Sequence, residues 1–271
     1  MKKFVRTAAA AALIVLLPVA AEAHKAWLLP SSTVLSGKDD LAVTIDAAAS
    51  NDLFFFDHRP LPLEGLVVTA PGGGAVTHEN ASTGKYRSTF DVPLKEKGTY
   101  RIALVSDGLF ARYKEDGKQK RWRGKAENLA KEIPASATEL VVTQSQRRLE
   151  TFVTVGNPDE AALKPTGAGL ELVPVTHPND LFANGEAEFK LMLDGKPAAG
   201  VKVEIVRGGI RYRNKLGDTT VTTDESGAFK YKWPEAGMYW LEAAVTDDKA
   251  SIKDAKERRA SYAATLEVLP E

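Results

Sequence analysis

The chain has 271 residues, of which 44% are hydrophobic and 27% are charged, as is normal for a globular protein. Its 36 basic and 36 acidic residues give a formal net charge of zero, so no global field recruits nucleic acid or an anionic membrane. The chain contains no cysteine, which excludes disulfides, thiolate metal sites and cysteine catalysis. Its length suits two domains of ordinary size.

The first 23 residues have the pattern of a secretory signal peptide. Three basic residues lie among the first six, an apolar stretch covers about 7–21, and Ala21–Ala23 is a small-x-small cleavage site. The apolar stretch is too short to favour a membrane-spanning helix, although an uncleaved anchor helix is the alternative. We therefore expect a soluble, periplasmic product that begins with His24.

Segments rich in Val, Ile, Thr and aromatic residues recur between residues 24 and 156, and turn signals such as Pro71–Gly74 separate them. Regular short strands of this kind predict an antiparallel β-sandwich. The range 24–156 is therefore expected to form an N-terminal β-sandwich domain. The strands expected in it are 41–47, 53–56, 65–69, 85–92, 99–105 and 151–155.

A charged segment near 113–131 interrupts this domain. It is dense in Lys, Arg and Glu, and its few large apolar residues are Trp122 and Leu129. The segment suits a solvated helix that caps the sandwich, or a long loop. A local patch for an anion or a partner is the functional alternative, but nearby acidic residues neutralise much of the run and favour a solvated face.

A linker is expected at 157–169, where prolines and small residues gather. In the range 170–271, apolar and charged residues alternate with a period of two, as in Val201–Ile205. One buried face and one solvent-exposed face predict a smaller, immunoglobulin-like β-sandwich. Its expected strands are 187–193, 201–206, 219–223, 228–233, 238–245 and 262–268.

Several short motifs occur along nearly the whole chain. They are His24–Leu28, Leu172–Leu181, Leu193–Pro197, Gly200–Val203, Thr223–Gly227 and Trp233–Glu242. In this order they resemble the DUF4198 family of bacterial periplasmic proteins, which is often labelled as the periplasmic component of cobalt or nickel uptake. The resemblance implies an N-terminal β-sandwich and a smaller immunoglobulin-like domain. It also suggests a role in metal uptake, with a membrane transporter or an outer-membrane receptor as partner.

His24 is the strongest candidate metal ligand. Cleavage after Ala23 would give it a free α-amino group beside its imidazole, and the two nitrogens could then chelate one metal ion. Nitrogen ligands of this type suit Cu(II), Ni(II), Co(II) and Zn(II), and the resembled family usually has a histidine here. The alternative is that cleavage leaves a histidine at this position with no function.

A chelate needs further ligands, and three other histidines are available. His58, next to Asp57, is expected at the rim of the sandwich, although the same residues suit a plain turn. His177, near Asp180, could meet the N-terminus or form a hydrogen-bonded corner, whereas His78 is expected in an exposed loop. There is no local His-x-His or His-x-x-x-His pair, so any metal site is assembled from distant segments.

Catalytic motifs are missing from the sequence, which has no Gly-x-Ser-x-Gly elbow and no phosphate loop. A copper monooxygenase also begins with histidine and uses a second one, so His58 or His177 leaves that alternative open. The expected function is non-enzymatic binding of nickel, cobalt or copper by His24, with a shell completed by His58 or His177 and by Asp57 or Asp180. The alternative is an immunoglobulin-like interaction module that binds a protein or a glycan without metal.

Overall fold

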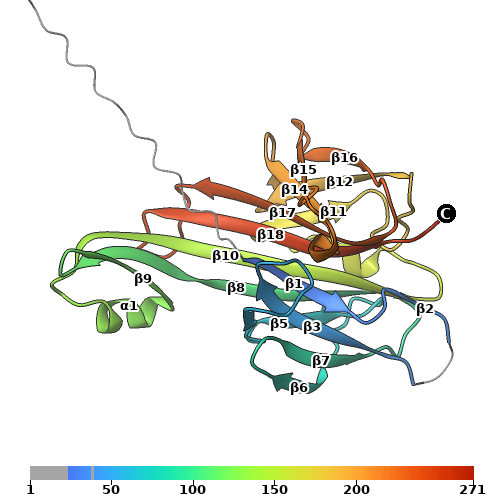
Figure 1. Ribbon diagram of the computed structural model, residues 1–271, viewed down its shortest axis with the longest axis horizontal. Coiled ribbons are helices and arrows are strands. Elements are labelled where there is room, and N and C mark those ends of the chain that lie inside the picture. Colours follow the sequence, from blue (N-terminus) through green and yellow to red (C-terminus); the bar gives the residue numbers. More distant parts are fainter. Residues whose placement is uncertain (1–23, 38–39) are drawn as a thin grey trace, which may run out of the picture.

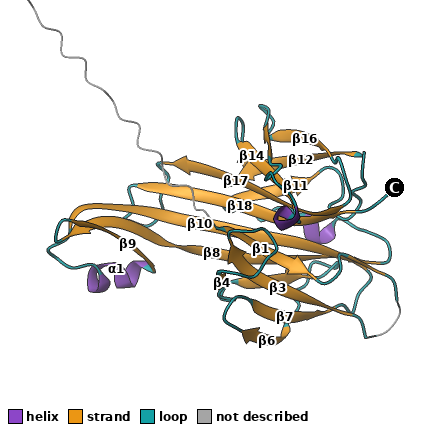
Figure 2. Cartoon of the chain, in the orientation of Figure 1, coloured by secondary structure: helices purple, strands orange, loops and turns teal. Residues whose placement is uncertain are grey.

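The computed structural model describes residues 24–37 and 40–271. The expected signal peptide lies outside these residues. The described chain is nearly all β, as predicted, with short helical segments only (Figure 2). No helix in this part of the chain is long and apolar enough to cross a membrane. The helical segments are α1 (Ala126–Glu132) and two 3-10 turns, η1 (Ala161–Leu163) and η2 (Ile210–Tyr212).

A central sheet of nine strands runs through the described structure. Its strands are β2 (Val34–Leu35), β5 (Leu66–Thr69), β8 (Gly98–Glu115), β9 (Lys118–Gly124), β10 (Thr138–Val155), β14 (Lys202–Arg207), β15 (Thr219–Thr222), β17 (Gly237–Asp247) and β18 (Glu257–Val268). The order is β15-β14-β17-β18-β10-β8-β5, with β2 paired to β10 and β9 paired to β8. Much of β10 and β18 is covered on both faces, so their residues are buried in near-continuous runs.

Two smaller sheets pack against opposite faces of the central sheet (Figure 1). The first contains β1 (Lys25–Pro30), β3 (Ala42–Ser50), β4 (Arg59–Pro60), β6 (Glu79–Thr83) and β7 (Ser88–Pro93). The second contains β11 (Leu170–Pro174), β12 (Glu186–Leu193), β13 (Lys196–Pro197) and β16 (Ala228–Lys232). Each small sheet encloses its own apolar core with the central sheet. The first core includes Trp27, Tyr100 and Trp240, and the second includes Phe189, Trp233 and Tyr262.

The two expected domains, 24–156 and 170–271, contribute strands to the same central sheet. β10 pairs in parallel with β18 from Thr143↔Glu257 to Thr151↔Thr265. The expected linker is also packed rather than free, since Leu163 is buried in the second core. The β-sandwich prediction is confirmed, with the sandwiches sharing one sheet.

The charged segment 113–131 forms an arm. β8 and β10 are each 18 residues long, and they extend past the small sheets together with β9 and α1 (Figure 1). A third small core supports the arm, and it contains Leu109, Tyr113, Leu129 and Val142. The segment is therefore a β-hairpin followed by a short helix, and not the cap or loop that its charge predicts.

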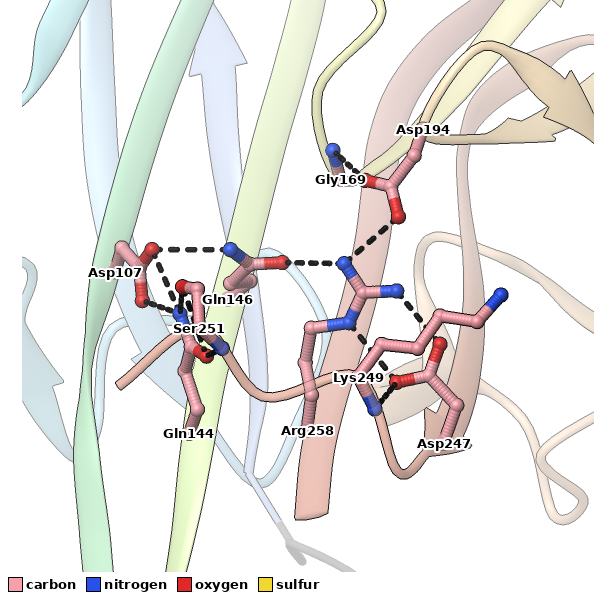
Figure 3. A network of polar contacts seen from close by, with 9 residues as sticks. All are labelled: Asp107, Gln144, Gln146, Gly169, Asp194, Asp247, Lys249, Ser251 and Arg258. Atoms are coloured by element: carbon pink, nitrogen blue, oxygen red, sulfur yellow. Dashed lines mark hydrogen bonds and ion pairs between the residues drawn. The ribbon is translucent and has the colours of Figure 1, made fainter. Parts of the chain in front are cut away.

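A polar network ties the central sheet to the loop before β18 and to the turn after β12 (Figure 3). The guanidinium of Arg258 donates to both oxygens of Asp247, at 3.0 and 2.6 Å, and forms an ion pair of 2.8 Å with Asp194. Asp194 also accepts a hydrogen bond from the backbone of Gly169. Two or more bonds to each charged group make this cluster stronger than a typical surface ion pair.

Acid should weaken this network. The bonds from Arg258 hold the pKa of Asp247 below its ordinary value, so its stabilisation is present above about pH 4 and is lost as the pH falls through the lowered pKa. We expect Asp247→Asn to lose less stability between pH 4 and 2 than the parent protein. Urea unfolding at several pH values measures this. Asp248→Asn, which removes an exposed neighbouring carboxylate, should keep the parent's pH dependence, and the same flattening in both variants would contradict the prediction.

Candidate functional site

His24 and His58 meet at one end of β3. His24 precedes β1, whose Lys25 pairs with Ser50, and His58 precedes β4, whose Arg59 pairs with Ala49. The two imidazole rings are stacked, with centroids 3.7 Å apart and planes 8° from parallel. Two of the sequence-predicted ligands, 34 positions apart in the chain, are therefore brought into direct contact.

The loop before His58 was predicted to be a strand at 53–56, and that prediction is wrong. These residues form a turn, and Phe54 has a φ of 61°, which is a left-handed conformation that a bulky residue adopts only when its surroundings hold it there. The ring of Phe54 packs edge-on against Trp27, with centroids 5.6 Å apart. Apolar packing therefore bends the chain into a turn here, where propensity alone favours an extended strand.

Close contacts fix this loop from two further sides. Gly208 lies against Phe54 so closely that an added Cβ would come within 2.8 Å of the ring. The backbone N–H of Asp57 donates to Ser50 Oγ at 3.2 Å. His58 is consequently held next to His24 by the packing of this loop against distant parts of the chain.

Charged side chains of both signs surround Lys25, the residue after His24. Lys25 forms an ion pair of 2.7 Å with Glu204, and its ammonium also lies 4.3 Å from the ring centroid of Trp240. Glu204 lines a shallow groove of about 250 Å³ together with Asp218 and Glu242. Lys202 lines the same groove, so the groove carries charges of both signs. The sequence analysis missed these residues, because their meeting depends on the pairing of β14 with β15 and β17.

His177 lies elsewhere and has a structural role. Its Nε2 lies 3.0 Å from Thr99 Oγ1 and 3.2 Å from the carbonyl of Asp159, and its Nδ1 accepts from the backbone of Asn179 at 3.2 Å. Burial lowers the pKa of His177 below its ordinary value. Of the two predicted arrangements, the structure shows the hydrogen-bonded corner.

The whole of β1 separates this corner from His24. Thr99 faces Thr154, which pairs with β2 beyond the far end of β1, and a strand of six residues spans about 20 Å. Asp180 is exposed and its N–H donates to the carbonyl of His177, so it stays at the same remote corner. His177 and Asp180 therefore do not join His24, because a metal–nitrogen bond is only about 2 Å long.

The remaining candidates add no third ligand. Asp57 is exposed beside His58, and His78 packs edge-on against Phe90 of β7. Within residues 24–37 and 40–271, no three His, Asp or Glu side chains are grouped closely enough to hold a metal ion. The candidate site is thus a histidine pair, His24 and His58, rather than the larger set that the sequence predicts.

The histidine pair has a definite limit on what it can bind as it stands. The lone pair of an imidazole nitrogen lies in the plane of its ring, and the two planes here are nearly parallel. Both rings can point a nitrogen at one metal ion only after one of them turns about its side-chain bonds. A primary amine on His24, produced by cleavage after Ala23, would lie on the Cα of the same residue and complete a set of three nitrogens.

Comparison with protein families gives one match that covers most of the chain. The model of DUF4198, a domain of unknown function, matches residues 21–247. The chain belongs to the DUF4198 family. The match includes His24, His58 and His177, and it ends at Asp247 before β18. No curated protein matches this DUF4198 chain.

Three of the solved structures that match this DUF4198 protein are remotely similar to it. The D0–D1 domains of intimin are 15% identical, with 89% of this chain and 97% of that chain covered and a TM-score of 0.23. Escherichia coli alpha-2-macroglobulin is 13% identical, with 92% and 20% covered and a TM-score of 0.24. A DUF3823 family protein from Bacteroides uniformis is 14% identical, with 79% and 92% covered and a TM-score of 0.24. These scores are too low to support any inference about function.

Proposed function

We propose that this DUF4198 protein is an exported, periplasmic protein that binds a divalent transition metal at His24 and His58. The observation that supports the proposal is the direct contact of the two imidazoles, 3.7 Å between centroids. One of these histidines is the residue that cleavage after Ala23 would place at the new N-terminus. The metal is cargo to be taken up or delivered, and the protein is not an enzyme.

The donor set fits borderline metals. Two imidazoles and one amine suit Cu(II), Ni(II) and Co(II), and affinities for such a nitrogen site rise in the order cobalt, nickel, copper. Nickel or cobalt is the physiological cargo that we propose, and copper is the metal that should bind most tightly in vitro.

A membrane transporter or an outer-membrane receptor is the proposed recipient. His58 is exposed and His24 is half-buried beside the end of β3, and three nitrogen donors leave coordination positions open for a ligand from a partner. A site that is open and incomplete suits transfer of a metal better than permanent storage, because structural metal sites are closed by a full ligand set.

Calorimetric titration of the purified protein with Ni(II), Co(II) and Cu(II) tests the metal proposal. We expect His58→Ala to lower the affinity at least about tenfold, since even the loss of an outer-shell partner of a ligand costs that much. One extra residue placed before His24 should have a similar effect, because it removes the primary amine. The N-terminus is read by mass spectrometry in every sample.

His78→Ala is the matched control, since it removes a histidine that packs against Phe90 on another part of the first small sheet. Its affinity should equal that of the parent protein. If His58→Ala binds as tightly as the parent, or if all three variants lose affinity equally, His24 and His58 are not the site.

An interaction module that binds no metal is the second candidate, and one observation favours it. Tyr212 is 88% exposed at the tip formed by η2, and the neighbouring Arg211 stacks 3.9 Å over the exposed ring of Phe55. Exposed aromatic and arginine side chains are typical of protein and glycan contacts. Absence of metal binding in the parent protein, combined with partner binding lost in Tyr212→Ala, would favour this function.

A further inference from the structure

The arm formed by β8, β9, β10 and α1 has two different faces. One face is packed, because Leu109, Ala111 and Tyr113 of β8 are buried in the third core with Leu129 of α1. Side chains alternate along a strand, so the residues between them point to the other face. That face has no core of its own, and the structure of the arm leaves it open to solvent.

Four basic residues lie on this open face. The register of β8 with β9 places Arg112 directly opposite Arg121, and Phe110 opposite Arg123. Lys114 follows on the same face of β8. We call Arg112, Arg121 and Arg123 the arginine face, and all three side chains are exposed. Like charges directly opposite one another destabilise a strand pair, so the Arg112–Arg121 pair works against folding.

Acidic partners do not offset this repulsion. Lys114 forms an ion pair with Glu139 at 2.7 Å, but among the described residues no carboxylate forms an ion pair with Arg112 or Arg121. The guanidinium groups of Arg112 and Arg123 lie 6.0 and 5.8 Å from the ring centroid of Phe110. Both positive charges therefore lie next to the same aromatic ring.

On the packed face of the same hairpin, by contrast, basic residues lie close to acidic ones. Lys118 and Lys120 lie there, and Lys120 is 4.0 Å from the carboxylate of Glu115. Trp122 on this face donates to Glu132 of α1 at 2.7 Å. The excess of positive charge therefore belongs to one face of the arm and not to its composition as a whole. A chain of zero net charge thus carries a local cationic surface.

Apolar groups complete the arginine face. Val141 of β10 pairs with Arg112 and is 42% exposed, and Phe110 is half-buried between the arginines. At the inner end of the face, Glu257 accepts a hydrogen bond from Thr143 at 2.9 Å. Basic residues interspersed with exposed apolar side chains are characteristic of surfaces that meet the headgroup region of a bilayer.

We propose that the arginine face docks on an anionic phospholipid surface. The guanidinium groups of Arg112 and Arg121 bind lipid phosphates, each capable of two parallel hydrogen bonds to one phosphate, and Val141 contacts the apolar boundary below the headgroups. The phosphates of an anionic bilayer are spread over a flat surface. This arrangement matches cations that are spread over the two paired strands β8 and β9. An acidic peptide is better held in a groove. The grooves found in the described structure are lined by residues of β14, β15 and β17, and by residues of β8 and β10 outside the arginine face.

Sedimentation with sucrose-loaded vesicles tests this docking. The probes are vesicles of phosphatidylcholine alone and of phosphatidylcholine mixed with phosphatidylglycerol. We expect binding only to the mixed vesicles, and weaker binding at high salt. Each basic residue near an anionic bilayer changes the partition coefficient about fivefold, so Arg112→Gln/Arg121→Gln should bind about 30-fold more weakly. All proteins come from a host that exports them and share one N-terminus, confirmed by mass spectrometry.

Lys118→Gln/Lys120→Gln is the matched control, because it removes two charges from the same hairpin on the packed face. Its binding should be much closer to that of the parent. The proposal is overturned by no binding to mixed vesicles, by undiminished binding of the arginine variant, or by equal losses in both variants. Arginine-dependent binding to polyglutamate without vesicle binding would also overturn it, and would assign the face to an acidic protein instead. None of these outcomes depends on metal binding at His24.

Discussion

Replacing Arg148 with methionine should lower the free energy of unfolding by about 3–5 kcal/mol, because it leaves buried carboxylates without their counter-charge. Arg148 is only 8% exposed, and Glu150 and Glu171 are each 2% exposed. The guanidinium lies 3.1 Å from Glu150 and 3.6 Å from Glu171. The second cation near Glu150 is Arg101, at 3.9 Å, so one arginine would face two buried acids in the variant.

The loss should be largest at neutral and alkaline pH. Burial raises the pKa of Glu150, and the charge of Arg148 opposes that rise. A raised pKa means that the native state holds a proton more tightly than the unfolded chain, so stability falls as the pH rises through the raised value. Without Arg148 the pKa rises further, and the variant should be closest to the parent near pH 5.

Urea unfolding of both proteins from pH 5 to 8 measures this effect. Arg121→Met is the control, since an exposed arginine away from such a cluster changes stability by about 0.5 kcal/mol or less. A loss below about 1 kcal/mol in Arg148→Met would show that the cluster accommodates the missing charge, by water entry or by movement of Arg101.

The strands of the second half were the most predictable part of the fold. The alternation in Val201–Ile205 appears as β14, in which Val203 and Ile205 are buried and Glu204 points to the other side. Ranges 187–193 and 228–233 match β12 and β16 within one residue at each end. A period of two is a local property, and one buried face is enough to reveal it.

The shared central sheet was not predictable from local patterns. The parallel pairing of β10 with β18 joins residues more than a hundred positions apart. The local sequence of either segment does not indicate which strand it pairs with. The sequence predicted only residues 151–155 of β10, whose 18 residues begin at Thr138. The half of β10 that belongs to the arm is largely polar. Apolar content therefore predicted a strand only at the other end of β10, which packs in the core.

The site was predictable in part for a similar reason. His24 stood out by its place after the cleavage motif, and His58 by its place beyond an apolar run. Their contact, however, depends on β1 and β4 reaching the same end of β3. His177 had equal weight in the sequence, but its bonds to Thr99 and Asp159 give it a structural role. Residue type identified candidates, and topology selected between them.

Replacing Trp27 with alanine should lower both stability and metal affinity. Trp27 is 1% exposed, and truncation of a buried tryptophan costs about 3–5 kcal/mol. Its indole supports Phe54 and Phe56, with centroids 5.6 and 6.3 Å away, and these rings hold the strained turn before His58. With the turn released, metal binding must order at least one backbone residue again, at about 1–2 kcal/mol, or roughly a tenfold weaker affinity.

Trp233→Ala separates this positioning effect from general destabilisation. Trp233 is also 1% exposed, and it packs edge-on against Tyr231 and Tyr239 in the second core. Its removal should therefore lower stability to a similar extent while leaving His58 in place. Calorimetric titration with Ni(II), at a temperature where both variants are folded, compares the two. Equal affinities in both variants would mean that the turn does not position His58, and that the histidine pair forms without help from the packing beneath it.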